Sequence, residues 1–224
     1  MKEETQKKVE AAIADWQYRE ELPAEYCGFR LQQLNQPIED RYDLFTYSNE
    51  GIRREVTAYY HEETHEYKLR VKIGLTEFCR IEFISPDLAR FEEVLRRELL
   101  ELLSAMVNFS AASLGSIVRA KNITTWEYGR NLPANLEGFE LFIKPAEPVT
   151  VLNGSLIVFD YSDFSIDSNF IIYYNVFRDE FFGEARIRNI PEMNYTFDST
   201  ELSELEEKLD AHLVKRLRGI RARA

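Results

Sequence analysis

One stretch of this chain occurs twice, and the repeat constrains the fold more than any other feature of the sequence. Residues 13–31 and 123–141 share the pattern I-x-x-W-x-Y-x-x-x-L-P-A-x-x-x-G-F-x-L, with nine identities in nineteen positions at a constant offset of 110. The identities include both tryptophans, Trp16 and Trp126. Chance does not produce such a match, so we expect a tandem duplication with two similar halves.

A second block extends the repeat at a slightly larger offset. Residues 42–103 align without a gap on 156–217, with sixteen identities in 62 positions at an offset of 114. The offset grows because the intervening segment has 10 residues in the first half (32–41) and 14 in the second (142–155). Loops absorb insertions at low cost and sheets do not, so both segments are predicted to be loops. We therefore expect a first repeat over 1–107, a linker over 108–122 and a second repeat over 123–224.

Each half is predicted to run helix, about five strands, helix. Apolar residues four and three apart predict a helix over 3–18, and short alternating stretches separated by turn residues predict an antiparallel meander. In the first half, the first expected strand begins at Gly28 and ends at Asn35-Gln36-Pro37. The other expected strands cover residues 44–47, 56–60, 69–73 and 78–84. The fold class is thus α+β, with helices over one face of each sheet. The other face needs cover, and the sister half in a pseudo-twofold arrangement would provide it.

The last helix of each half has the clearest pattern. In the first half Ser85 is expected as N-cap, with Pro86 at the first helical position and an apolar stripe that includes Leu95, Leu99 and Leu103. The second half repeats this plan from Ser199, with a stripe that includes Leu209.

Charge and composition limit the classes of partner. The formal net charge is −11, which argues against a nucleic-acid partner, because phosphate binding needs a concentrated positive surface. The charge suits a cationic partner or no particular partner, and charge alone does not separate these two. The basic segment 215–223 is attributed to cations at a helix C-terminus. The two cysteines, Cys27 and Cys79, are too few and too irregularly placed to predict a disulfide framework. The N-terminal residues do not resemble a signal peptide, and no stretch has the length and apolarity of a membrane span. We therefore expect a cytoplasmic protein without membrane contact.

The segment His61-Glu62-Glu63-Thr64-His65 matches the H-E-x-x-H pattern of zinc peptidases. On a helix this spacing places two imidazoles on one face, with the glutamate as base beside the metal-bound water. Here the flanking residues are strand-like, and the second half has Asn175-Val176-Phe177-Arg178-Asp179 instead. We therefore expect a hairpin turn with exposed histidines and no metal or cofactor. A zinc-dependent hydrolase that uses His61, Glu62 and His65 remains the alternative.

The equivalent hairpin of the second half carries the candidate partner site. Residues 175–183 (NVFRDEFFG) replace the charged 61–69 (HEETHEYKL) and place aromatic rings around a charged tip. Aromatic residues dominate interface hot spots, so this hairpin is predicted to contact another protein or a second copy of the chain. The candidate contact residues are Phe177, Arg178, Phe181 and Phe182. The alternative is that these rings pack on 107–122 or 142–155.

Three function classes follow from these observations. The leading one is a non-catalytic, acidic protein-binding module of the immunity, chaperone or regulatory type, either monomeric or homodimeric. The zinc-dependent hydrolase is the second. The third is a small-ligand sensor with an aromatic pocket between the repeats, because the duplicated Trp and Tyr residues could stack on a ligand, although they are also expected to anchor each helix on its sheet.

Overall fold

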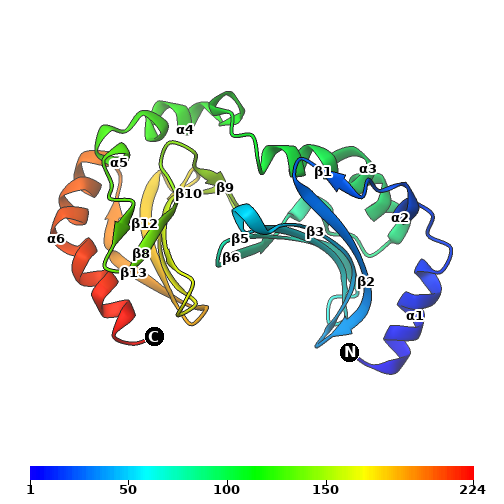
Figure 1. Ribbon diagram of the computed structural model, residues 1–224. Helices are drawn as coiled ribbons and strands as arrows, with labels where there is room; N and C mark the ends of the chain where they lie inside the picture. The colour runs from blue at the N-terminus through cyan, green and yellow to red at the C-terminus, as the bar shows by residue number, and fades with distance from the viewer. The chain divides into compact units, whose positions relative to one another are not determined.

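The computed structural model describes residues 1–224, and the chain divides into two compact units, Met1–Phe109 and Ser110–Ala224. Each unit is mixed α+β with one antiparallel sheet (Figure 1), which confirms the predicted fold class at this level. The segment expected as a linker is divided: residues 110–122 belong to the second unit. No helix has the length and apolarity that crossing a membrane requires.

The first unit contains a six-stranded sheet in the order β1-β2-β3-β4-β5-β6. Its elements are α1 (Glu3–Ile13), α2 (Tyr18–Glu21), β1 (Glu25–Tyr26), β2 (Phe29–Ile38), β3 (Arg41–Asn49), η1 (Glu50–Ile52), β4 (Arg54–His61), β5 (Glu66–Ile73), β6 (Thr76–Cys79), η2 (Ile81–Phe83) and α3 (Leu88–Ala105).

The second unit contains a seven-stranded sheet whose main path is β13-β12-β11-β10-β8-β7, with β9 paired to β10. Its elements are η3 (Ala111–Ser113), α4 (Ser116–Ala120), η4 (Ile123–Thr125), α5 (Glu127–Arg130), β7 (Asn135–Leu136), β8 (Phe139–Ile143), β9 (Val149–Thr150), β10 (Ser155–Asp163), β11 (Ser168–Asn175), β12 (Glu180–Ile187), β13 (Ile190–Ser199) and α6 (Leu202–Arg221).

One long helix lies against one face of each sheet (Figure 1). In the first unit α3 buries Phe91, Val94, Leu95, Leu99 and Leu103, and in the second α6 buries Leu205, Leu209, Leu213, Leu217 and Ile220. The predicted apolar stripes therefore form the helix side of each core. Because adjacent strand residues point to opposite faces, the residues between the core positions of each strand lie on the face away from the long helix.

Equivalent side-chain contacts tie the repeated stretch to each sheet. The indole Nε1 of Trp16 donates to Glu92 Oε2 and that of Trp126 donates to Glu206 Oε1, both at 2.6 Å. Two tyrosines likewise donate to the carbonyl of the Leu-Pro segment at 2.7 Å, Tyr47 to Pro23 and Tyr161 to Pro133. Both tryptophans are buried, and so they act as anchors in their own units.

Several predicted boundaries are wrong, for local reasons. The first helix ends at Ile13, and a separate turn of helix begins at Tyr18. Strand β2 continues through Asn35-Gln36-Pro37 with a bulge between Gln33 and Gln36. Proline is tolerated there because β1 pairs only with Phe29 and Arg30, so β2 has a free edge beyond that point. The expected loop 32–41 is consequently a hairpin between β2 and β3.

The last strand and the helix start also differ from expectation. Strand β6 ends at Cys79 and is followed by a 3-10 turn, whereas its counterpart β13 extends from Ile190 to Ser199. Helix α3 begins at Leu88 with Asp87 as N-cap, whose Oδ1 accepts from Arg90 N at 2.8 Å. The predicted cap, Ser85, instead bonds Asp87 N through its hydroxyl at 3.2 Å and positions the residue that caps the helix.

Candidate functional sites

The HEETH segment forms the end of the β4–β5 hairpin, as predicted. His61 is the last residue of β4, residues 62–65 form the turn, and His65 has a left-handed backbone with φ of 57°. His65 Nδ1 lies 3.3 Å from the hydroxyl of Tyr60, whereas His61 contacts Asp40 and Thr64. The neighbouring strand residues Tyr60 and His61 point to opposite faces, so the two imidazoles are directed to opposite sides of the hairpin.

This geometry does not match a zinc-peptidase site. Glu62, the candidate base, accepts a hydrogen bond from Lys2 N at 2.8 Å and lies 3.7 Å from the terminal amino group. The bond from the Lys2 amide lowers the pKa of Glu62, which favours its ionised form. The residues His61, Glu62 and His65 therefore have three separate sets of partners. His65 is exposed as expected, but His61 is half-buried beside Asp40, with 21% of its side chain exposed.

The β11–β12 hairpin end is organised by the side chain of Asn175. Its Oδ1 accepts from the amides of Phe177 and Arg178, both at 3.0 Å, and its Nδ2 donates to Asn153 O at 3.1 Å and Ser155 Oγ at 3.0 Å. The turn is thereby held to the β9–β10 connection, and Phe177 points outward.

Aromatic residues of this hairpin differ sharply in exposure. Phe177 is 81% exposed, and its ring lies over Gly154, where an added Cβ would be 2.6 Å from the ring. Phe182 is half-buried and stacks on Tyr173 at 5.1 Å between centroids. Phe181 is fully buried against Tyr174, so its inclusion among the contact residues is wrong: it points to the helix side of the sheet.

The charged residues of the tip are paired within the second unit. Arg178 lies 2.5 Å from Glu180, and Asp179 lies 2.8 Å from Lys121 and accepts from the Tyr174 hydroxyl at 2.7 Å. The Lys121 contact lowers the pKa of Asp179. Lys121 comes from the segment expected to be a linker, and no local sequence pattern marks it as a partner of this turn.

A cavity of about 290 Å³ lies next to this hairpin end. The apolar side chains that line this cavity include those of Leu114, Ile117, Val118, Leu156 and Val176. Gly154, which lies beneath the ring of Phe177, also lines the cavity, and Ile117 is 51% exposed. Phe177 therefore stands beside the cavity. The sequence indicated Phe177 but not the helical turn at Ser116–Ala120 that completes the surface.

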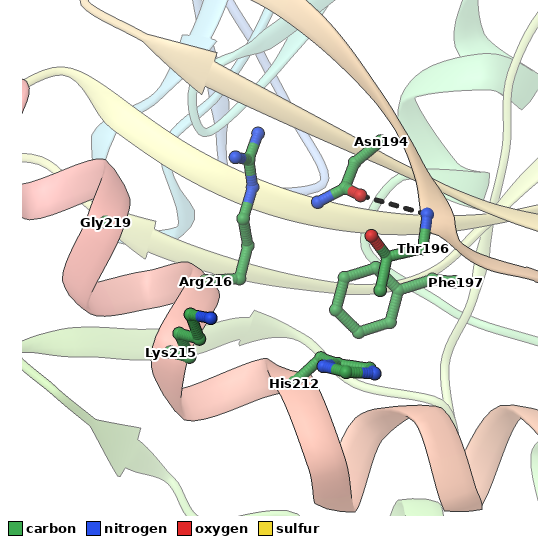
Figure 2. Close-up of a pocket in the computed structure, with 7 residues that line it drawn as sticks. All are labelled: Asn194, Thr196, Phe197, His212, Lys215, Arg216 and Gly219. Carbon is green, nitrogen blue, oxygen red and sulfur yellow. Dashed lines mark hydrogen bonds between the residues drawn. The ribbon is translucent and has the colours of Figure 1, made fainter.

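A second cavity, of about 350 Å³, lies between β13 and α6. Figure 2 shows Asn194, Thr196 and Phe197 on the strand side and His212, Lys215 and Arg216 on the helix side. Arg216 is paired with Glu192 at 2.9 Å. Three further arginines of the basic segment pair with carboxylates of the same unit: Arg218 with Glu137, Arg221 with Asp163 and Arg223 with Glu192. The basic segment thus holds α6 to its own sheet.

A buried carboxyl group occupies the helix-free face of the second sheet. Asp160 is fully buried, and it accepts from Ser162 Oγ at 3.0 Å and from Asn169 Nδ2 at 3.1 Å. Burial raises the pKa of Asp160 to about 7, and the two hydrogen bonds only partly oppose this. The equivalent residue of the first unit is Thr46, whose hydroxyl lies 3.1 Å from that of Thr57.

Comparison of the chain with protein-family models, with curated proteins and with solved structures gives no match.

Proposed function

We propose that the protein is a non-catalytic protein-binding module and that its second unit contacts the partner through the β11–β12 hairpin end. The observation that carries this proposal is an exposed phenylalanine, Phe177, beside an apolar cavity of about 290 Å³. An exposed ring of this size costs solubility unless a partner covers it, and a cavity next to it can accept an apolar side chain from that partner.

The contact surface consists of Phe177, Ile117 and the cavity lined by Leu114, Val118 and Val176. Of the other residues predicted for this hairpin, Arg178 adjoins Phe177 in the turn, whereas Phe182 stacks on Tyr173 and lies outside this surface. The partner would present a segment with exposed aliphatic or aromatic side chains, one of which enters the cavity. The ion pairs of Arg178 with Glu180 and of Asp179 with Lys121 keep the tip in one conformation, which lowers the entropic cost of binding.

We further propose that the two units are diverged copies of one α+β unit. The same order of six strands, with β9 added in the second sheet, and the matched contacts of Trp16 with Glu92 and of Trp126 with Glu206 support this origin. In this proposal the first copy keeps a charged hairpin end, and the second copy has acquired the apolar contact surface. We place the function in the cytoplasm, where the free thiols of Cys27 and Cys79 would stay reduced.

Photo-crosslinking in the native host tests the binding role. A photoreactive phenylalanine analogue is placed at position 177 or 117, and the matched control carries it at position 81, because Ile81 is 71% exposed on the first unit. We expect one protein to be captured from positions 177 and 117 and not from position 81. With that protein purified, Phe177→Ser should weaken binding roughly 30-fold, as for a hot-spot residue, while Ile81→Ser leaves the affinity unchanged.

Two results would contradict the proposal. One is capture of the same protein from position 81, which would indicate a nonspecific contact. The other is unchanged affinity in the Phe177→Ser variant. Capture of a second copy of this chain would show self-association in place of binding to a different protein. Sedimentation of the wild-type protein and of Phe177→Ser would then compare their oligomeric states.

A further inference from the structure

Three potential metal ligands from two separate turns lie together at one end of the first sheet. Asp40 belongs to the turn between β2 and β3, and His61 and Glu63 belong to the β4–β5 hairpin end. Their ligand atoms all lie within 4.8 Å of one another. The Glu62 amide donates to the Asp40 carbonyl at 2.8 Å, so a backbone hydrogen bond fixes the two turns side by side.

The imidazole of His61 is already oriented for this role. Its Nε2 is 3.1 Å from Asp40 Oδ2, and its Nδ1 is 3.1 Å from the hydroxyl of Thr64. Histidines that bind metals usually donate their second ring N–H to an oxygen, which sets the tautomer and the ring direction. Without an ion, Nε2–H can donate to Asp40 Oδ2. When an ion replaces that proton, Nδ1–H can donate to Thr64 Oγ1, and the Nε2 lone pair is directed to the side of the Asp40 carboxylate.

We propose that Asp40, His61 and Glu63 bind a divalent transition-metal ion of the Zn²⁺ type. One imidazole nitrogen and two carboxylate oxygens are common zinc ligands, and water would complete the coordination. A nitrogen ligand disfavours Mg²⁺ and Ca²⁺, which prefer oxygen ligands alone. The carboxylates of Asp40 and Glu63 are solvent-accessible, so side-chain rotation is enough to bring them to the ion.

The consequence is a clamp between the two turns. The ion would join Asp40 and His61, which are 21 positions apart and are now linked only by a direct contact. Metal–ligand bonds would hold the two turns together more strongly than this contact. This site is distinct from the H-E-x-x-H pattern, because it uses His61 without Glu62 or His65. It also lies in the first unit, so metal binding here does not depend on the proposed contact surface at Phe177 in the second unit.

Isothermal titration of the full chain with Zn²⁺ tests the site, with Mg²⁺ as the control cation. We expect saturable binding of one Zn²⁺, loss of that binding in His61→Ala and in Glu63→Gln, and no change in His65→Ala. Thr64→Val should weaken binding roughly tenfold through loss of the outer hydrogen bond. In NMR spectra the imidazole signals of His61 should shift on Zn²⁺ addition, whereas those of His65 should stay in place.

Glu63→Gln keeps the test decisive if His61→Ala does not fold, because Glu63 is exposed and its change leaves the core intact. The proposal is overturned if the wild type shows no saturable Zn²⁺ binding. It is equally overturned if His65→Ala abolishes binding, or if Glu63→Gln and His61→Ala bind Zn²⁺ as the wild type does.

Discussion

The two hairpin ends of the protein share a backbone hydrogen bond and differ in nearly every side chain. In the first unit the Glu62 amide donates to the Asp40 carbonyl, and in the second the Val176 amide donates to the Gly154 carbonyl, both at 2.8 Å. At the same positions Asp40 is replaced by Gly154, His61 by Asn175 and Glu63 by Phe177. A polar group of metal-ligand type in one unit thus corresponds to an exposed aromatic ring over a glycine in the other.

This difference shows which contacts maintain the fold and which are free to change. The backbone hydrogen bond closes the turn in both units, and the buried rings behind it, Tyr67 and Phe181, occupy equivalent strand positions. The side chains at the other positions of the two turns differ, and some of them still hold their own turn, as Asn175 does by accepting from Phe177 N and Arg178 N. The shared positions therefore supply the packing of each sheet, and the proposed contact surface lies among the positions that differ.

The largest effect should separate two neighbouring aromatic residues of the second hairpin. Phe181→Ala should reduce the free energy of unfolding by about 3–5 kcal/mol, because it removes a fully buried ring. Phe177→Ala should change it by less than about 0.5 kcal/mol, because that ring is 81% exposed. Urea unfolding of both variants measures the difference. Similar losses in the two variants would show that Phe177 belongs to the core and would remove it from the contact surface.

A smaller effect should distinguish the helix-free faces of the two sheets. The pKa of Asp160 is raised from 3.8 to about 7 in the folded protein, so the folded state binds more protons than the unfolded state between these values. Stability from this group is therefore fully present below about pH 4 and is lost as the pH rises through about 7. Asp160→Asn should raise the free energy of unfolding at pH 8 by up to about 4 kcal/mol relative to wild type, and by little at pH 4.

Urea unfolding at both pH values checks this prediction. The matched control is Thr46→Val at the equivalent position of the first sheet, which has no ionisable group and should leave the pH dependence unchanged. An Asp160→Asn variant with the same pH dependence as wild type would show that the carboxyl titrates normally in the folded protein.

The smallest effect concerns the glycine beneath Phe177. Gly154 has a φ of +69°, and an added Cβ would lie 2.6 Å from the Phe177 ring. Gly154→Ala should therefore cost about 1–2 kcal/mol from the left-handed backbone, plus displacement of the ring. Asp40→Ala at the equivalent position should cost less, because Asp40 does not have a positive φ. Thermal unfolding of both variants gives the comparison, and equal costs would indicate that the two turns have the same backbone requirements.

Much of the fold could be predicted from the sequence because its cause is local. Alternation at Leu69, Val71 and Ile73 predicts a strand with one wet face, and the structure has β5 there with those three residues buried. The apolar spacing of Leu95, Leu99 and Leu103 predicts the buried face of α3 in the same way. Boundaries were less predictable, since Pro37 breaks a central strand but is accepted at the free edge of β2, and edge status depends on the neighbouring strand.

The candidate sites depended on tertiary structure to a greater degree. The sequence by itself determined the repeat, the periodicity of strands and helices, and the exchange of a charged hairpin end for an aromatic one. Only the tertiary structure decided that Phe181 is buried while Phe177 is exposed, that Asp40 and not His65 accompanies His61, and that Lys121 reaches Asp179. The physical reason is the distance along the chain over which each effect acts. Backbone preference and periodicity act over a few residues, whereas these contacts join side chains brought together by strand register and chain return, which no local pattern encodes.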